Sequence, residues 1–326
     1  MGTILIAYHL FPDIEVERAI LKQVNAEVIW IDGFDSEHDR ALVRNTDALM
    51  VALEKVSAEL IESMERCRIV CRVGTGIDTI DIAAATQRNI WVTNVPDYSV
   101  DEVSSHAIAF LMMHARRLVP LLKVTQEGTW NGNSVRPIAR LKGQTLGLVG
   151  LGRIGRAVAA KAQGLGLNVI AYDPYLADST NSIDGVQLTD FETLLRSADF
   201  ISLHVPLMEG TTAIINAKAL ALMKPTAFLI NTARGPLIDE DALLLAIREQ
   251  RIAGAALDVL ATEPPASDHP LLHQERVFVT PHMGWYSEAA NIDVRVRGAE
   301  DVVRVMRGEK PRTPVNQVAS PPTVSL

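Results

Sequence analysis

Cysteine is scarce in this sequence, and its scarcity excludes two classes of structure. Cys67 and Cys71 are the only thiols in 326 residues, too few for a tetrahedral zinc site or a disulfide framework. We expect both to be buried and reduced. The other potential ligands do not make up for them, because no cluster of histidine and carboxylate residues has metal-ligand spacing. The sequence therefore predicts no bound metal.

Positive charge and long apolar runs are also lacking. The sequence has 31 basic and 39 acidic side chains, a net charge of −8 with no basic block, so we expect no nucleic-acid partner. The most apolar helical stretch, residues 107–113, is far too short to span a bilayer. The first residues run directly into a strand pattern and lack the features of a signal peptide. We therefore expect a cytoplasmic protein without a membrane partner.

The sequence is instead rich in short β-favouring apolar runs that alternate with helix-period segments. This alternation is typical of parallel sheets with crossover helices, and the length suits two domains. It predicts an α/β fold with two Rossmann-like, doubly wound parallel-sheet domains. The expected strands fall in two sets, the first including residues 3–7, 27–30, 48–53, 69–73 and 91–95, and the second 145–149, 168–172, 200–205, 227–231, 254–259 and 277–280.

One long helical pattern separates the two sets of strands. It runs from residue 100 to about residue 127, and we expect a kink at Pro120. Residues 128–137 read as an irregular loop. A last helix is expected over residues 287–307, ending at Gly308, and a proline-rich tail follows over residues 311–326.

The second set of strands opens with a glycine-rich turn. Gly150 permits the turn, Gly152 lets the backbone approach a pyrophosphate, and Gly155 allows close packing of helix and strand. The helix that follows presents free N–H groups to the phosphates. Asp173, at the end of the next strand, is placed to bind the ribose hydroxyls and to repel a 2′-phosphate, which predicts NAD over NADP. The cofactor-binding turn comprises Gly150, Leu151, Gly152, Arg153, Ile154 and Gly155; the alternative is a turn that merely connects two elements.

Three charged or titratable residues follow three later strands. Arg234, Glu263 and His282 should all lie at the carboxyl ends of strands, where α/β sheets bind ligands. A histidine steadied by a carboxylate is suited to give a proton to a keto oxygen, or to remove one from a hydroxyl. A guanidinium grips a carboxylate with two parallel hydrogen bonds. Each residue also has a purely structural alternative. Arg234 could form a surface ion pair, Glu263 could cap a helix or a turn, and His282 could be a hydrogen-bonded polar side chain before a loop.

The remaining histidines are weaker candidates. His106 and His114 lie on the long helical pattern, where we expect packing or solvent roles. His204 ends a strand and should lie near the site, but it has no obvious partner. The other four look like loop or terminal positions: His9, His38, His269 and His273.

Taken together, these stretches resemble the D-isomer-specific 2-hydroxyacid dehydrogenases. The resemblance covers roughly residues 68–317. Three further segments are similar to the branch of this family that contains the C-terminal binding proteins and their bacterial relatives: residues 72–78, 94–103 and 282–288. The segments that carry the family resemblance are residues 149–155, 222–225, 231–235, 255–259 with Glu263 and Pro264, and 280–282.

The resemblance implies roles for further residues. Arg72 and the backbone of Gly74, Thr75 and Gly76 would bind the substrate carboxylate, and Trp285 would form a wall of the substrate pocket. Met283 departs from the small residue that relatives often have, so substrate preference does not transfer from any one relative. Residues implied around the cofactor are Val103, Val205, Pro206, Thr232, Ala233 and Asp258, the last beside the nicotinamide carboxamide.

The resemblance also implies an architecture and a function. Residues 1–98 with 290–326 would form the substrate-binding domain and residues 99–289 the NAD-binding domain, with the active site in the cleft and homodimers pairing through the helix that begins at Val100. The predicted function is hydride transfer between NAD(H) and a small D-2-hydroxy acid or 2-keto acid, with His282 as general acid and base. An NAD-sensing scaffold or corepressor that binds partner peptides is the alternative, and phosphite or formate oxidation is a more distant one.

Overall fold

The chain alternates strands and helices almost throughout. The computed structural model describes residues 2–8, 10–176 and 182–319, so His9 lies outside the described residues. The chain divides into two compact units, Met1–Ser99 with Ser287–Leu326 and Val100–Tyr286. A boundary at residue 290 would cut helix α11 (Glu288–Met306) in its first turn, whereas the compact unit takes in the whole helix. The predicted α/β class is confirmed.

The first unit is built on a five-stranded sheet whose strands all pair in parallel. The strand order is β2-β1-β3-β4-β5, which reverses direction between β1 and β3 in the flavodoxin-like manner. Strands β3 and β4 are buried along their whole length, which is why they read as continuous apolar runs. The strands are β1 (Gly2–Ala7), β2 (Ala26–Trp30), β3 (Ala48–Val51), β4 (Ile69–Arg72) and β5 (Trp91–Thr93); the helices between them are α1 (Glu15–Leu21), α2 (Glu37–Arg44), α3 (Ala58–Ser63) and α4 (Ile82–Gln87).

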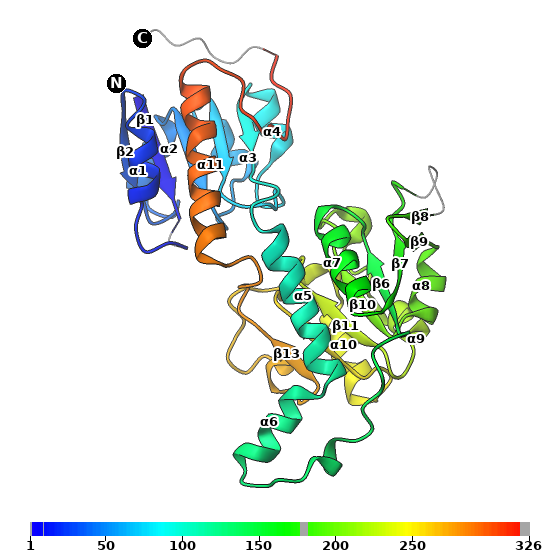
Figure 1. Ribbon diagram of the computed structural model, residues 1–326. Helices are drawn as coiled ribbons and strands as arrows, with labels where there is room; N and C mark the ends of the chain where they lie inside the picture. The colour runs from blue at the N-terminus through cyan, green and yellow to red at the C-terminus, as the bar shows by residue number, and fades with distance from the viewer. Residues whose placement is uncertain (1, 9, 177–181, 320–326) are drawn as a thin grey trace. The chain divides into compact units, whose positions relative to one another are not determined.

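The last helix returns the chain to the first unit. Helix α11 packs on α1 and lies along the sheet (Figure 1). Arg295 of α11 donates to both carboxylate oxygens of Glu17 of α1 at 2.7 Å, and these two side chains are 3% and 0% exposed. The described part of the proline-rich tail is ordered on β5, because Asn316 accepts a hydrogen bond from the Val92 N–H at 2.9 Å.

The second unit is an eight-stranded sheet with the order β13-β12-β11-β10-β6-β7-β9-β8. Among the strands formed by described residues, only β8 and β9 pair antiparallel. The strand order reverses between β6 and β10, the point at which α/β sheets bind nucleotides. The strands are β6 (Thr145–Val149), β7 (Asn168–Tyr172), β8 (Ser182–Ile183), β9 (Val186–Leu188), β10 (Phe200–Leu203), β11 (Phe228–Asn231), β12 (Gly254–Leu257) and β13 (Val277–Val279); the helices are α5 (Val100–Ala115), α6 (Leu118–Gln126), α7 (Arg153–Gly164), α8 (Phe191–Ser197), α9 (Ala217–Leu222) and α10 (Glu240–Arg248), with 3-10 turns at η1 (Gly132–Val135), η2 (Glu209–Thr211), η3 (Gly235–Leu237) and η4 (Pro270–His273).

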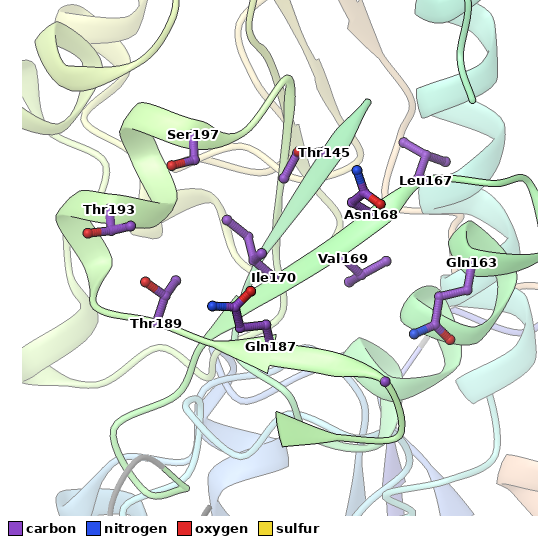
Figure 2. A pocket seen from close by; sticks show the side chains of 11 residues that line it. Thr145, Gln163, Leu167, Asn168, Val169, Ile170, Gln187, Thr189, Thr193 and Ser197 are labelled. Carbon is purple, nitrogen blue, oxygen red and sulfur yellow. The ribbon is translucent and has the colours of Figure 1, made fainter. Parts of the chain in front are cut away.

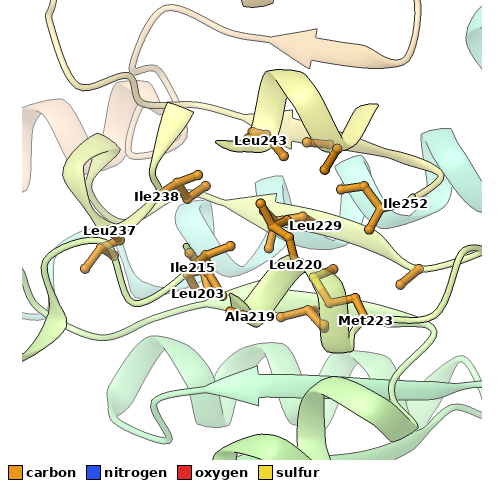
Figure 3. Packing of buried hydrophobic residues seen from close by; sticks show 14 of the residues in the cluster. Leu203, Ile215, Ala219, Leu220, Met223, Leu229, Leu237, Ile238, Leu243 and Ile252 are labelled. Carbon is orange, nitrogen blue, oxygen red and sulfur yellow. The ribbon is translucent and has the colours of Figure 1, made fainter. Parts of the chain in front are cut away.

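Two apolar cores lie in this second unit. Figure 3 shows part of one of them, in which Leu203 and Leu229 of the sheet meet Leu220 of α9 and Leu243 of α10. The other core joins strand residues such as Leu148 and Ile230 to α5 and α7. The carboxyl ends of the strands, where the site residues lie, are thus held by packing on both faces.

The predicted single helix over residues 100–127 is wrong. The chain forms two helices, α5 and α6, and Arg117 between them has a left-handed backbone with φ 53°. The kink was expected at Pro120, but this residue lies in the first turn of α6. Backbone N–H groups in the first turn of a helix have no acceptor within the helix, so proline breaks no hydrogen bond there. The β8–β9 hairpin was also not predicted from the sequence, nor was the η1 turn, which lies in the expected irregular loop.

Candidate active site

The glycine turn lies at the reversal point of the second sheet. Gly150 has a φ of +97°, and a Cβ built on it would lie 2.8 Å from the His204 carbonyl. A Cβ on Gly155 would lie 2.3 Å from the Gly150 carbonyl oxygen, so this glycine lets α7 begin directly against the turn. Gly152 has open space where its Cβ would be. A phosphate group can therefore approach the backbone closely at Gly152.

The start of helix α7 is suited to an anion. Its N-cap is Gly152, which provides no side-chain acceptor for the first N–H groups, and both Gly152 and Arg153 are exposed. Asp173, after β7, is fixed beside the turn because its carboxylate accepts from the Leu151 N–H at 2.9 Å and the Tyr175 N–H at 3.0 Å. Ile154 packs into the core beneath. These residues fit a dinucleotide whose pyrophosphate meets the turn.

The loops after β10 and β11 hold the next residues predicted to line the cofactor. Val205 and Pro206 follow β10 directly, and a Cβ on Gly150 would touch Val205 at 2.9 Å. Thr232 and Ala233 follow β11, and within the described chain the buried Thr232 hydroxyl has no hydrogen-bond partner. A buried hydroxyl of this kind is suited to a ligand. Val103, by contrast, is a buried residue of α5.

His282 and Glu263 form the central contact of the site. His282 Nδ1 lies 2.6 Å from Glu263 Oε2, and Glu263 Oε1 accepts from the Leu260 N–H at 2.9 Å. Burial alone would raise the pKa of Glu263, but the hydrogen bond and charge of His282, the Leu260 N–H and the charge of Arg234 together hold that pKa below its usual range. Glu263 is therefore a carboxylate at neutral pH. Because Glu263 accepts the hydrogen bond from the Nδ1–H group of His282, Nε2 is left to face a substrate.

Arg234 reaches this pair through a close contact of two loops. Gly235, which follows it, would place a Cβ only 2.0 Å from the Leu260 carbonyl carbon, so the loop after β11 can meet the loop that carries Glu263 only with glycine at this position. The Arg234 carbonyl also accepts from the Asn231 side chain at 2.8 Å. Gly235 is therefore part of the sequence pattern that places Arg234 near Glu263.

The loop that carries His282 is tied to Asp258. His282 has a left-handed backbone with φ 55°, an unfavourable conformation for a residue with a side chain. The Asp258 carboxylate accepts from the N–H groups of Met283 at 2.9 Å and Gly284 at 2.7 Å, and its carbonyl accepts from the His282 N–H at 2.8 Å. Sequence reasoning missed this bracing of the loop, and the role of Asp258 beside a carboxamide stays a prediction.

The first unit contains the residues predicted to bind a carboxylate. Arg72 ends β4 and is buried, and its Nη1 donates to the Val73 carbonyl at 2.8 Å. The loop of Gly74, Thr75 and Gly76 follows directly, and the Asn94 side chain donates to the Thr75 carbonyl at 2.6 Å. A Cβ on Gly74 would lie 2.5 Å from Arg72 Nη1, so this glycine makes room for the guanidinium. Sequence reasoning assigned no role to Asn94.

Two aromatic rings and a methionine follow His282. Trp285 is half-buried and meets the Tyr286 ring edge to face at 5.3 Å. Met283 is exposed. These positions are compatible with an apolar wall beside the histidine, and the role of Trp285 in the substrate pocket stays a prediction.

A cavity of about 530 Å³ lies elsewhere in the second unit (Figure 2). Thr145 and Asn168 open β6 and β7, so the cavity lies at the amino ends of the strands whose carboxyl ends precede Gly150 and Asp173. The described residues that line it are all uncharged: Thr145, Gln163, Leu167, Asn168, Val169, Ile170, Gly185, Gln187, Thr189, Thr193 and Ser197. It is therefore unsuited to hold a carboxylate or to transfer a proton, and it is not the candidate active site.

Two kinds of feature are absent from the described residues. Among them, no three His, Cys, Asp or Glu side chains are grouped so that they could hold a metal ion. In the same part of the chain, no helix combines the length and the hydropathy needed to cross a bilayer.

Comparison with known proteins identifies the family. Residues 108–284 match the family model described as "D-isomer specific 2-hydroxyacid dehydrogenase, NAD binding domain". The glyoxylate reductase of Thermococcus litoralis is 40% identical over 290 residues, which cover 86% of this chain and 87% of the relative. The chain belongs to the D-isomer specific 2-hydroxyacid dehydrogenase family. The predicted family, fold class and NAD-binding domain are thereby confirmed.

Two further relatives of this dehydrogenase-family chain are informative. The D-3-phosphoglycerate dehydrogenase of Archaeoglobus fulgidus is 39% identical over 303 residues, 92% of this chain and 57% of the relative, so the chain spans about half the length of such relatives. The crystal structure of the Aquifex aeolicus D-lactate dehydrogenase with NAD and lactic acid has a TM-score of 0.85 at 27% identity, covering 94% of this chain and 96% of that one. These relatives lend no support to the scaffold alternative, and the narrower branch stays a prediction.

Proposed function

We propose that this chain is an NAD-dependent dehydrogenase that interconverts a D-2-hydroxy acid and its 2-keto acid. The observation that carries the proposal is the 2.6 Å contact between His282 Nδ1 and Glu263 Oε2, in a chain whose second unit matches an NAD-binding domain. A histidine whose other nitrogen is held by a carboxylate is equipped to donate and accept a proton. The stereochemistry follows from the family alone.

In the reductive direction, the protein residues supply a proton and hold the substrate. NADH, when bound, supplies the hydride that adds to the keto carbon. Arg234 grips the substrate carboxylate and polarises the neighbouring carbonyl, because its guanidinium offers two parallel donors. His282 donates its Nε2 proton to the oxygen that becomes the hydroxyl, and Glu263 stabilises the imidazolium beforehand. In the oxidative direction the neutral His282 removes the hydroxyl proton.

We propose that the first unit completes substrate binding. The buried Arg72 and the backbone N–H groups of residues 74–76 follow a strand end, where they are suited to a carboxylate, and the contact from Asn94 supports this loop. Trp285 would favour an apolar or thioether side chain over a phosphate. The substrate class is therefore a small 2-keto acid with an uncharged side chain.

Cofactor choice, assembly and location form the finer part of the proposal. Asp173 beside the turn favours NAD, since a carboxylate repels a 2′-phosphate. A homodimer that pairs through the segment beginning at Val100 is supported by exposed apolar side chains on α6, Leu118, Val119 and Leu122, and by Trp130 just beyond it. A cytoplasmic location is supported by two free, buried cysteines, Cys67 and Cys71.

A panel of 2-keto acids assayed with NADH tests the proposal. Pyruvate, phenylpyruvate, glyoxylate, hydroxypyruvate and a methylthio keto acid should give measurable turnover for at least one member, with NADPH much poorer. His282→Ala should lower kcat by roughly 10²- to 10⁴-fold, while NADH binding measured by fluorescence changes little. Wild-type protein inactive on the whole panel, or His282→Ala with near-normal kcat, would contradict the proposal.

A further inference from the structure

His106 of helix α5 reaches the loop that carries His282. Its Nε2 lies 3.0 Å from Thr280 Oγ1, and Thr280 Oγ1 lies 2.5 Å from Asp258 Oδ1. Nε2 itself is 3.7 Å from the same carboxylate oxygen. The expectation that His106 has only a packing or solvent role is therefore incomplete, because its imidazole is hydrogen-bonded to Thr280, two positions before His282.

The direction of these bonds follows from the number of hydrogens. Thr280 has one hydroxyl hydrogen, and it is donated to Asp258. The Thr280 oxygen can then only accept from His106, so His106 Nε2 must carry a hydrogen. The chain of donors runs from His106 through Thr280 to the Asp258 carboxylate. Substituting His106 with an apolar residue would leave the hydroxyl without its donor and free it to rotate away from Asp258.

Asp258 connects these hydrogen bonds to the loop that carries His282. The side chain is 2% exposed, and its two oxygens accept from Thr280, Met283 and Gly284, which lie on both sides of His282. The left-handed backbone of His282 persists only while such contacts hold it. A relaxed loop would turn the imidazole away from the line between Glu263 and the substrate.

The His106 ring is itself held in place. It meets the Phe110 ring edge to face at 4.5 Å. A Cβ on Gly284 would lie 3.4 Å from His106 Cγ and 2.8 Å from Asp258 Oδ2, so the absence of a side chain at this position lets the loop close over both groups. The imidazole is therefore a fixed donor rather than a mobile surface group.

We infer that His106 is a positioning residue for the general acid His282, acting through Thr280 and Asp258. This inference rests on the proposed dehydrogenase function. It assigns His106 of helix α5 a part in setting the catalytic geometry. A displacement of about 1 Å at a reacting group can cost roughly 100-fold in rate, so the loss of this donor should be measurable.

Two substitutions at His106 separate donation from packing. His106→Gln keeps an N–H donor at about the position of Nε2 and should retain kcat within about threefold, whereas His106→Leu cannot donate and should lower kcat by roughly 10- to 100-fold. The KM for NADH should stay unchanged in both. His114→Phe is the matched control on the same helix: His114 stacks on Phe228 at 3.9 Å, and phenylalanine keeps that stacking.

Hydrogen exchange gives a second readout that needs no turnover. In His106→Leu, the amides of Met283 and Gly284 should exchange faster than in the wild type, while those of β6 stay protected. Unchanged kcat and unchanged exchange in His106→Leu would overturn the inference, as would a His106→Gln variant as impaired as His106→Leu. A wild-type protein inactive on every keto acid refutes the proposed function instead, and the exchange measurement still decides whether His106 holds the loop.

Discussion

At the scale of single residues, the site depends on a negative charge placed behind an imidazole. Glu263 is only partly shielded from water, yet its pKa lies below the usual range: burial alone would raise it, and the contacts with His282, the Leu260 N–H and Arg234 outweigh that effect. A carboxyl group with a depressed pKa keeps its charge from neutral pH down through mildly acidic solution. The imidazolium of His282 thus has its counter-charge wherever the reduction is expected to run.

Removing that charge should lower the activity and abolish one pH dependence. Because the pKa of Glu263 lies below its usual range, wild-type kcat/KM with NADH should hold through mildly acidic solution and fall only where this carboxylate becomes protonated. Glu263→Gln has no carboxylate to protonate, so its kcat/KM should be lower by roughly tenfold or more and should lack that acidic fall. A pH profile of kcat/KM for both proteins measures this. An acidic fall at the same pH in both proteins would show that Glu263 does not support His282.

Arg234 should not be replaceable by lysine. Arg234→Lys keeps the charge but loses the two parallel donors, so KM for the keto acid should rise and kcat should fall together, by about tenfold or more in kcat/KM. Steady-state kinetics at saturating NADH measures both constants. The exposed Arg248→Lys is a suitable control on α10. If Arg234→Lys retains normal kcat/KM, the carboxylate is bound by another group.

The sequence predicted the site residues unevenly, for a physical reason. The proximity of Glu263, His282 and Arg234 could be predicted because each follows a strand, and parallel strands bring their carboxyl ends to one edge; their catalytic roles stay a prediction. His106 could not, because its contact with Thr280 joins residues 174 positions apart and depends on how α5 lies on the sheet. Helical periodicity shows which face of a helix is buried but not which loop that face meets.

At the scale of elements, strands were easier to predict than the ends of helices. Buried parallel strands such as β3 and β11 are continuous apolar runs, which identify them directly. The break between α5 and α6 occurs at Arg117, where no glycine or asparagine marks the left-handed residue that usually ends a helix. Pro120 lies three residues later, inside the first turn of α6. Strands as short as β8, with two residues, give no periodic signal.

The left-handed backbone of Arg117 predicts a stabilising substitution. A side chain at φ 53° and ψ 37° costs about 1 kcal/mol relative to glycine. Arg117→Gly should therefore leave stability unchanged or raise it by up to about 1 kcal/mol, whereas Arg117→Val should lower it. Urea unfolding of the three proteins gives the comparison. A loss of stability in Arg117→Gly would mean that the side chain makes contacts that outweigh the strain.

At the scale of the whole molecule, the first unit is assembled from two distant parts of the chain. The Arg295 guanidinium of α11 and the Glu17 carboxylate of α1 form a buried ion pair across this join, and Glu17 also accepts from the Tyr8 hydroxyl at 2.7 Å. Arg295→Met leaves a buried carboxylate without its partner and should cost about 3–5 kcal/mol. Urea unfolding followed by hydrogen exchange in β1 measures this loss.

An exposed ion pair on the same helix provides the control for that loss. Arg297 lies 2.5 Å from Asp97, and these side chains are 33% and 49% exposed, so water screens this pair far more than the buried one. Arg297→Met should cost less than about 1 kcal/mol. Equal losses in Arg297→Met and Arg295→Met would show that α11 is sensitive to any substitution, rather than to the buried charge.

The join also sets an order of events during synthesis. Residues 2–99 leave the ribosome before the second unit, but the helix that packs on their sheet, α11, is made after the entire second unit. The second unit can therefore fold while the first unit lacks α11 and the apolar face on which this helix packs is still exposed. Chaperones would bind such an exposed apolar face. We expect nascent chains halted after residue 286 to bind NADH while β1 to β5 remain open to protease. Protection of those strands at that stage would show that α11 is not needed to close the first unit.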